Sequence, residues 1–166
     1  MRFSPLRIRG TAARETELAR SAMLAAADDD ASVSARLAHG DELFGWQSPD
    51  GSVACFCWVR YRGRAIGPVA LRDQPGRVFM YNAQTLPQFR GQGLYRALLK
   101  HMMFTLTKEQ HTEFIGDVDR RNTLSRRGIE SSGFTHAASI TLVKLVGRWD
   151  RQLRRTITDR SMAPLF

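Results

Sequence analysis

The sequence contains few cysteines and no hydrophobic run long enough to cross a membrane. Its two cysteines, Cys55 and Cys57, lie two residues apart in the strand-like segment ACFCWV. Thiols in that arrangement rarely reach disulfide geometry, and no other metal ligands lie nearby in the sequence, so we expect buried, reduced thiols and no metal site. No apolar run approaches the ~20 residues of a membrane span, and the basic start MRFSPLRIRG lacks the apolar stretch of a secretory signal. We therefore expect a cytoplasmic protein without a membrane span.

Acidic residues are also in the minority, with 16 against 25 basic residues and a formal charge of +9. That excess suits nucleic acid, an anionic membrane surface or a polyanionic small molecule. The chain lacks the interleaved basic and aromatic residues typical of nucleic-acid binders, so we do not expect a nucleic-acid partner. The length of 166 residues and a hydrophobic content of 43% predict one globular domain, 1–166, whose last part, 148–166, is an atypical basic tail.

The stretch from Val78 to Leu106 reads as an apolar strand, a glycine-rich turn and a helix. The turn, QFRGQG, carries two glycines, which let the backbone approach an anion while their N–H groups point toward it. The following helix adds the positive end of its dipole, and its apolar residues at 94, 98, 99, 102, 103 and 106 form one buried face. The Walker and dinucleotide patterns both fail, because there is no Gly-Lys-Ser/Thr and no third glycine at the required spacing. We expect a phosphate-sized ligand where the helix begins.

Two motifs, in this order along the chain, resemble those of the GNAT acetyltransferase superfamily. The residues from Gln88 to Gly93 match its Gln/Arg-x-x-Gly-x-Gly/Ala signature in full. The family's second motif, Asn-x-x-Ala/Ser followed by Gly-Phe, is matched at the family's spacing by Asn122, Ser125, Gly133 and Phe134. The resemblance covers about 41–146. It implies an α/β GNAT acyl-CoA N-acyltransferase fold, with a mixed, mostly antiparallel sheet of six to seven strands flanked by about four helices.

The resemblance also implies acetyl-CoA as the co-substrate, no metal, and a set of binding residues. In the family the glycine turn wraps the pyrophosphate, and the pantetheine arm slips between two splayed strands and pairs with exposed strand backbone. Asn122 is implied to bind pantetheine or orient the acceptor, although asparagine also suits a simple helix cap. The implied cofactor-binding residues are Gln84, Thr85, Leu86, Gln88, Phe89, Arg90, Gly91, Gln92, Gly93, Leu94, Tyr95, Asn122 and Ser125.

Asp117 is the candidate general base. It lies five residues before Asn122, where several members of the family carry an acidic residue proposed to deprotonate the amine, and strand parity would place it on one face with Ile115. A carboxylate with a pKa near ~4 would need burial or an intervening water to act near neutral pH. The alternative is that Asp117 only faces solvent at a strand end. Asp119 and Glu130 are weaker candidates.

The general acid is where the chain departs from the family's pattern. The position seven residues after Asn122, usually tyrosine in the family, is Ile129, which cannot donate a proton. Tyr81 or Tyr95 are the candidate substitutes, although Tyr95 also suits a helix-packing role. Otherwise the thiolate takes its proton from water, or the chain binds an acyl-CoA without turning it over.

The resemblance implies an N-acetyltransferase that moves an acetyl group from acetyl-CoA to a primary amine by direct attack in a ternary complex. We expect the amine to belong to a small metabolite or amino sugar, since no extended acidic or peptide-reading segment is visible. A protein or peptide amine acetyltransferase, and a non-catalytic acyl-CoA-binding or regulatory module of the same fold, are the alternatives. The assembly state is left open and includes a homodimer.

The remaining elements follow from local patterns. Strands are predicted at 3–9, 43–47, 52–61, 78–85, 113–118 and 139–146, the first at a sheet edge because of Pro5 and the third covered on both of its apolar faces. Helices are predicted at 11–27, 31–39, 92–107 and 122–133, with Thr11 as the cap of the first. The aspartates at 28–30 suit capping better than metal binding. Trp149, Leu153 and Ile157 recur every four residues among arginines, which favours a basic amphipathic helix, with a short strand at 155–158 as the alternative.

Overall fold

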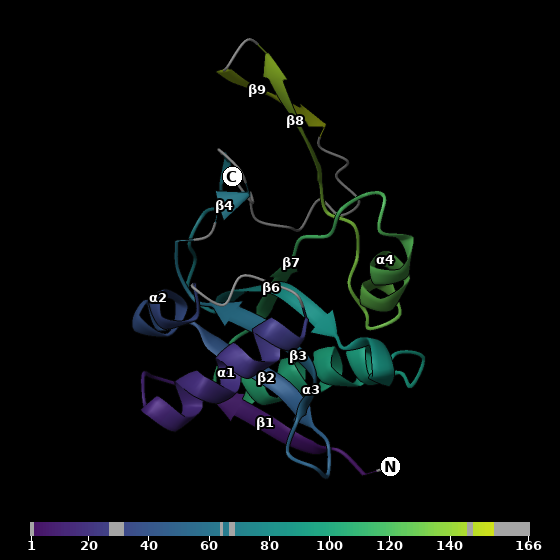
Figure 1. The fold of residues 1–166 in the computed structure, drawn as a ribbon. Coiled ribbons are helices and arrows are strands. Elements are labelled where there is room, and N and C mark those ends of the chain that lie inside the picture. The colour runs from purple at the N-terminus through teal and green to yellow at the C-terminus, as the bar shows by residue number, and fades with distance from the viewer. Residues whose placement is uncertain (1, 27–31, 64, 67–68, 146–147, 155–166) are drawn as a thin grey trace.

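The fold is built on a five-stranded mixed sheet with helices on both faces (Figure 1). A computed structural model describes residues 2–26, 32–63, 65–66, 69–145 and 148–154. The strands lie in the order β1-β2-β3-β6-β7, and the β6–β7 pair is parallel while the other pairs are antiparallel. Their bounds are Ser4–Ile8, Glu42–Gln47, Val53–Arg60, Arg77–Thr85 and Glu113–Gly116. The mixed, mostly antiparallel character agrees with the prediction, with β1 and its proline at the sheet edge.

Four helices flank the sheet in the described part of the chain, which is the number predicted. Helix α3 follows β6 after a short 3₁₀ turn, η1 (Pro87–Phe89), and it buries the face that the apolar spacing predicted: Leu94, Leu98, Leu99, Met102 and Leu106. None of the described helices is long and apolar enough to cross a bilayer. The helix bounds are Ala13–Ala25 for α1, Val33–Ala38 for α2, Leu94–Lys108 for α3 and Thr123–Glu130 for α4.

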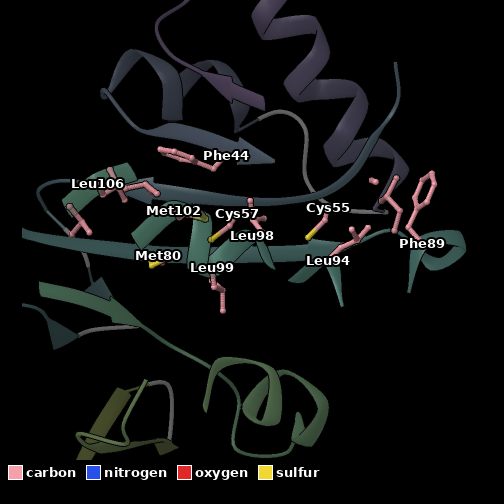
Figure 2. Close-up of a cluster of buried hydrophobic side chains, with 14 residues drawn as sticks. Phe44, Cys55, Cys57, Met80, Phe89, Leu94, Leu98, Leu99, Met102 and Leu106 are labelled. Atoms are coloured by element: carbon pink, nitrogen blue, oxygen red, sulfur yellow. The ribbon is translucent and has the colours of Figure 1, made fainter. Parts of the chain in front are cut away.

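Strand β3 is the centre of the molecule because both of its faces are apolar. All of its residues from Val53 to Val59 are buried. Cys57 and its neighbours at alternate positions pack with helix α3 in one core cluster, shown in Figure 2. Phe56 and Trp58 belong to a second cluster with residues of α1 and α2. The strand therefore separates two cores, as its sequence predicted.

The sheet has five strands rather than the predicted six to seven. Strand β8 (Ser139–Leu145) forms as predicted, but within the described residues it pairs with β9 (Arg148–Arg154) as a separate two-stranded sheet. A second small sheet joins β4 (Ala65–Ile66) and β5 (Val69–Ala70). Figure 1 shows the β8–β9 hairpin standing apart from the main sheet.

The predicted C-terminal helix is wrong over residues 148–154, which form a strand. Trp149 and Leu153 lie on β9, in antiparallel register with Lys144 and Ile140 of β8. Residues four apart share a face in a strand as well as in a helix, because four is a multiple of the strand period of two. The spacing therefore did not discriminate between the two structures. Ile157 and the alternative strand at 155–158 lie outside the described residues.

The first helix starts later than predicted, and its predicted cap is wrong. Helix α1 begins at Ala13, and Ala12 occupies the cap position without a side-chain hydrogen bond. The carbonyl of Ala12 accepts the first helical bond, from the N–H of Thr16 at 2.9 Å, so Thr11 lies one residue before the cap. The aspartates at 28–30, with their predicted capping role, lie outside the described residues.

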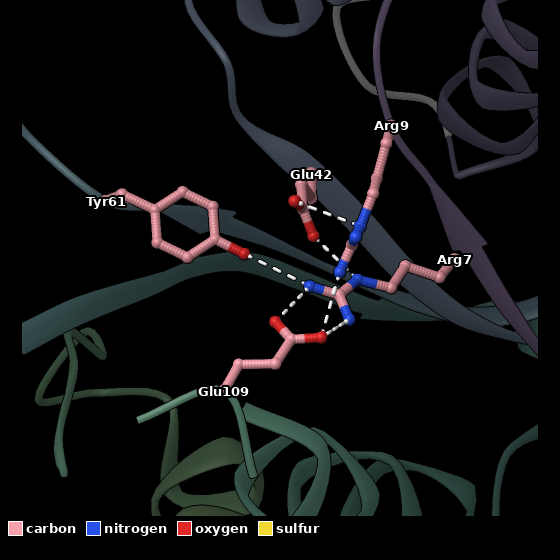
Figure 3. Close-up of polar contacts among 5 residues, drawn as sticks. All are labelled: Arg7, Arg9, Glu42, Tyr61 and Glu109. Carbon is pink, nitrogen blue, oxygen red and sulfur yellow. Dashed lines mark hydrogen bonds and ion pairs between the residues drawn. The ribbon is translucent and has the colours of Figure 1, made fainter. Parts of the chain in front are cut away.

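A charged network ties the first strands to the C-terminal end of α3 (Figure 3). Arg7 contacts Glu42 at 2.7 Å and Glu109 at 2.5 and 2.8 Å, and it donates to the Tyr61 hydroxyl at 3.4 Å. Arg9 contacts Glu109 at 3.0 Å and Glu42 at 3.2 Å. Hydrogen bonding from Arg7 lowers the pKa of Glu109 to about 2. The network secures the end of α3 that lies away from the glycine turn.

Candidate functional site

The β6–β7 pair opens halfway along β6. Pairing covers residues 77–80 of β6 and 113–116 of β7, where β7 ends. Within the described residues, the rest of β6 has no neighbouring strand on that edge. At the same point Asn82 adopts a φ of 48°, and the register with β3 slips between Phe56 and Trp58. This β-bulge bends β6 and leaves its main-chain groups facing a gap.

The glycine turn lies at the end of the same strand. Gly91 and Gly93 have φ values of 76° and 72°, and nothing lies within 4 Å of a Cβ built on either residue. The first bond within α3 runs from the N–H of Ala97 to the carbonyl of Gly93 at 3.0 Å, so the earlier N–H groups have no acceptor in the helix. Arg90 holds the turn in place by donating from Nε to the Thr85 carbonyl at 3.1 Å. The turn can therefore receive an anion on its backbone amides.

A cleft of about 520 Å³ lies between the end of β6, the glycine turn and helix α4. Most of the predicted cofactor-binding residues line it, but Leu86, Gln88 and Gln92 do not. Leu86 is buried instead, and its N–H donates to the Ala54 carbonyl at 3.0 Å. The lining residues are Ala83, Gln84, Thr85, Phe89, Arg90, Gly91, Gly93, Leu94, Tyr95, Arg96, Asn122, Leu124, Ser125 and Gly128.

Four of these lining residues were missed from the sequence: Ala83, Arg96, Leu124 and Gly128. A Cβ on Gly128 would lie 2.6 Å from two ring carbons of Tyr95. Only glycine at position 128 therefore lets the Tyr95 ring pack this closely against helix α4. A glycine inside a predicted helix was a usable signal of such close packing. Leu124 is 79% exposed on the cleft, and nothing local distinguished it from a core leucine.

Asn122 caps helix α4. Its side-chain oxygen accepts the backbone N–H of Ser125 at 3.0 Å, and both residues line the cleft. The cap interpretation of Asn122 is therefore confirmed. The cap also places the start of α4 against the cleft, opposite the glycine turn.

The two candidate tyrosines lie in different places. Tyr81 belongs to the core cluster on the α1–α2 face, and its hydroxyl donates to Asp41 Oδ2 at 2.5 Å. Tyr95 packs on Gly128 and lines the cleft. Burial is the largest cause that raises the pKa of each tyrosine, so both hydroxyls stay protonated at neutral pH. Of the two, Tyr95 is the one that the structure brings to the cleft.

The acidic candidates lie outside the cleft lining. Strand β7 ends at Gly116, two residues before its predicted end, so Asp117 follows the strand and strand parity does not place it. Asp119 shapes the turn before α4, since its carboxylate accepts the N–H of Arg121 at 2.7 Å. Glu130 forms an exposed ion pair with Arg126 at 3.6 Å. The role of Asp117 as a base stays a prediction.

Ile129, at the family's tyrosine position, takes part in packing. A Cβ built on Gly116 would lie 2.9 Å from Ile129 Cδ1 and 4.0 Å from the ring of Phe134. Ile129 also borders the core cluster that contains α3. The side chain therefore holds α4 against the end of β7 and does not line the cleft.

The cysteines next to the site are structural, as predicted. Cys55 and Cys57 are buried and form no disulfide. Burial raises the pKa of Cys55 to about 11, and Thr85 donates its hydroxyl to the sulfur at 3.2 Å. Buried thiols with raised pKa values are poor nucleophiles. In the described part of the chain, no three His, Cys, Asp or Glu side chains are grouped so that they could hold a metal ion.

The sequence and the fold both match known acetyltransferases. Residues 20–134 match the model of the acetyltransferase (GNAT) family, and no curated protein gives a significant match. An aminoglycoside N-acetyltransferase, AAC(6')-Iy, in complex with CoA shares the fold with a TM-score of 0.65 and 18% identity, over 88% of this chain and 97% of that one.

Two further solved structures share the fold at low identity. One is the ribosomal-protein-alanine N-acetyltransferase from Brucella melitensis biovar Abortus 2308, with a TM-score of 0.64 and 13% identity over 87% of this chain and 100% of that one. The other is the aminoglycoside antibiotic 6'-N-acetyltransferase AAC(6')-Ih from Acinetobacter baumannii, with a TM-score of 0.62 and 15% identity over 87% and 98%. The family match covers more than half of the chain, which therefore belongs to the acetyltransferase (GNAT) family of acetyl-CoA-dependent N-acetyltransferases.

Proposed function

We propose that the chain binds acetyl-CoA in the cleft and transfers the acetyl group to a primary amine by direct attack in a ternary complex. The glycine turn carries this proposal. Gly91 and Gly93 leave open space, and the first N–H groups of α3 lack acceptors in the helix, so the backbone is complementary to a diphosphate. The arginine side chains of Arg90 and Arg96 add positive charge to the lining.

The gap beside β6 suits the pantetheine arm. That arm carries two amides. On its β7 side, β6 has no neighbouring strand among the described residues where Gln84 and Thr85 line the cleft, so its main-chain groups on that side are open. Acetyl-CoA supplies an activated acyl group when bound. The chain's part is to hold that group, to polarise its carbonyl with main-chain N–H groups and to position the amine. These tasks need few special side chains, so the motifs identify the cofactor rather than the acceptor.

We assign the proton for the departing thiolate to Tyr95. Its hydroxyl belongs to a cleft residue and is held protonated by burial. Tyr81 is instead hydrogen-bonded to Asp41 on the other side of the sheet. In this proposal Tyr95 takes the role of the tyrosine that the family usually has at the position of Ile129.

We assign the base to Asp117, which follows the last residue of β7 at the opening of the gap. A base is needed most at low pH, where more of the amine is protonated. The Asp117→Asn variant should therefore lose more turnover at low pH than at high pH, which steady-state rates between pH 6 and 9 would measure. A rate–pH profile parallel to that of the wild type would remove Asp117 from the mechanism.

The acceptor that we propose is a small amine, such as a metabolite or an amino sugar. Release of free thiol from acetyl-CoA over a panel of amines tests the function, and titration calorimetry with CoA tests the cleft. The panel should include an aminoglycoside and a peptide with an N-terminal alanine, because fold neighbours named for both kinds of substrate exist. Thiol release with the peptide alone would replace the small amine by a protein acceptor. Calorimetric binding of CoA without release for any amine would contradict the proposed reaction.

A further inference from the structure

Arg36 on helix α2 is a half-buried arginine whose charge has no acidic partner among the described residues. Its Nη1 atom is buried and makes no hydrogen bond. A buried donor without an acceptor costs stability, and the cost is larger for a charged group. Such a group in a folded protein points to a missing acceptor.

The guanidinium is held in place by aromatic rings. Its central carbon lies 5.2 Å from the ring centroid of Trp58 and 5.4 Å from that of Tyr81. Both rings lie within cation–π range of the guanidinium and restrict where it can lie. The side chain is therefore oriented before any ligand arrives.

The carboxylate that Tyr81 contacts, Asp41, is already committed to other donors. Asp41 is 1% exposed and receives three bonds from Arg60, at 2.6, 2.9 and 3.0 Å. It also receives the Tyr81 hydroxyl at 2.5 Å and contacts His39 Nδ1 at 3.1 Å. A carboxylate with these partners has little capacity left for Arg36. Asp41 is therefore not available to pair with Arg36.

Arg36 lies on the side of the sheet opposite the cofactor cleft. It covers Tyr81, which belongs to the α1–α2 core cluster, whereas Ala83, two residues further along β6, lines the cleft on the α3–α4 side. The gap beside β6 begins just before Tyr81, after the last β6–β7 pair at Met80. A ternary complex needs separate approaches for the cofactor and the amine. The proposed cofactor cleft occupies the α3–α4 side of the sheet, so the α1–α2 face remains for the amine.

We propose that Arg36 binds a carboxylate of the acceptor, so that the preferred substrate is a small amine that also carries a carboxylate, of the amino-acid type. This inference rests on the proposed acetyl transfer and adds the chemical class of its acceptor. A planar guanidinium matches a carboxylate through two parallel hydrogen bonds. An acceptor that carries only positive charge would leave the guanidinium unpaired and would be repelled by it.

Matched acceptor pairs test the assignment. Each pair has the same amine and differs only in a carboxylate or a carboxamide, as with glycine and glycinamide or β-alanine and its amide. The wild type should prefer the acid, and Arg36→Met should lower the acid-to-amide ratio of kcat/KM by about 10-fold or more, mainly through KM. Comparing the ratio between variants cancels the difference in amine basicity within a pair.

Two further variants and one binding measurement complete the test. Arg36→Lys keeps the charge but not the two-bond geometry, and it should retain an intermediate ratio. Arg14→Met removes an exposed arginine of α1 and should leave the ratio unchanged. Calorimetry with the CoA-loaded protein should show that the acids bind more weakly to Arg36→Met than to the wild type, without any turnover. An equal ratio in wild type and Arg36→Met would overturn the role of Arg36, whereas absence of thiol release from every amine would instead overturn the proposed reaction.

Discussion

The two ends of the β6–α3–β7 unit treat their polar groups in opposite ways. At the end where β6 and β7 begin, the Arg77 side chain is fully buried and donates to Glu113 at 2.8 and 2.9 Å, to the Arg72 carbonyl at 2.7 Å and to Gln74 at 3.0 Å. The charged network around Glu109 closes the same end of α3. Every guanidinium nitrogen of Arg77 has an acceptor from the chain itself.

At the other end the polar groups are left open. The strands separate after four pairs, and the glycine turn presents N–H groups that the helix does not use. The two ends differ in hydrogen bonding: side chains with acceptors lie at the closed end, and main-chain groups without partners in the helix or sheet lie at the open end, where we propose that the ligand binds. Substitutions at the two ends should therefore affect different measurements.

The largest expected effect is on cofactor binding at the open end. Gly93→Asp places a carboxylate against the proposed diphosphate site, and a juxtaposed like charge costs several kcal/mol, so CoA affinity should fall by about 100-fold or more. Titration calorimetry would measure this. Gly10→Asp is the matched control, because Gly10 has a similar φ of 70° and equally open surroundings. Unchanged affinity in Gly93→Asp would show that the turn is not the binding site.

The next effect concerns stability at the closed end. Glu113→Gln leaves the buried Arg77 guanidinium without its carboxylate, and the free energy of unfolding should fall by about 2 kcal/mol, a little less than for a fully buried pair because Glu113 is partly exposed. Urea unfolding would measure the loss, while CoA affinity should not change. The control is Glu130→Gln, which breaks an exposed pair at 3.6 Å and should cost less than about 0.5 kcal/mol. Equal losses in both variants would show that the buried Arg77–Glu113 pair stabilises the fold no more than an exposed ion pair does.

A smaller effect is expected on turnover. Tyr95→Phe removes the proposed proton donor but keeps the ring that packs on Gly128, so kcat should fall by about 10-fold, with water supplying the proton in its place. Steady-state kinetics with saturating acetyl-CoA would measure it. If Tyr81→Phe lowers kcat and Tyr95→Phe does not, the acid lies on the α1–α2 face instead.

The smallest effect is the pH dependence of the closed end. The folded pKa of Glu109 lies near 2, below its ordinary value of 4.5, because Arg7 donates to it. Its stabilisation is therefore present above about pH 4.5 and is lost as the pH falls toward 2. Because Glu109 is 38% exposed and screened by solvent, we expect about 1 kcal/mol. Unfolding of Glu109→Gln followed from pH 6 to 2 should show a shallower acid slope than the wild type. Parallel curves would contradict the prediction.

The outcome for the cleft shows how far local patterns reach. The QFRGQG turn and the apolar face of α3 were readable because their residues are neighbours in the chain or one helical turn apart. Asn122 was readable for the same reason, since a cap acts within three residues. Leu86, which was also predicted to bind the cofactor, does not line the cleft, and its N–H goes to Ala54, on a strand far away in the sequence.

Long-range contacts decided the remainder. The close approach of Tyr95 to Gly128, the packing of Ile129 on Gly116 and the saturation of Asp41 each join segments that are distant in the chain. The orphaned Nη1 of Arg36 has no signature in its local sequence either. The hydrogen bonding and packing of these side chains depend on which distant residues the fold brings into contact with them.

By itself the sequence determined the family, the glycine turn before α3 and most of the secondary structure, because these rest on short-range spacing and on backbone preferences of a few residues. Only the tertiary structure decided how many strands join the sheet, where β6 separates from β7, and which tyrosine lines the cleft. The physical reason is that strand pairing and burial are set by contacts between distant segments. Apolar residues spaced two or four apart in the sequence are compatible with more than one secondary structure and more than one strand partner.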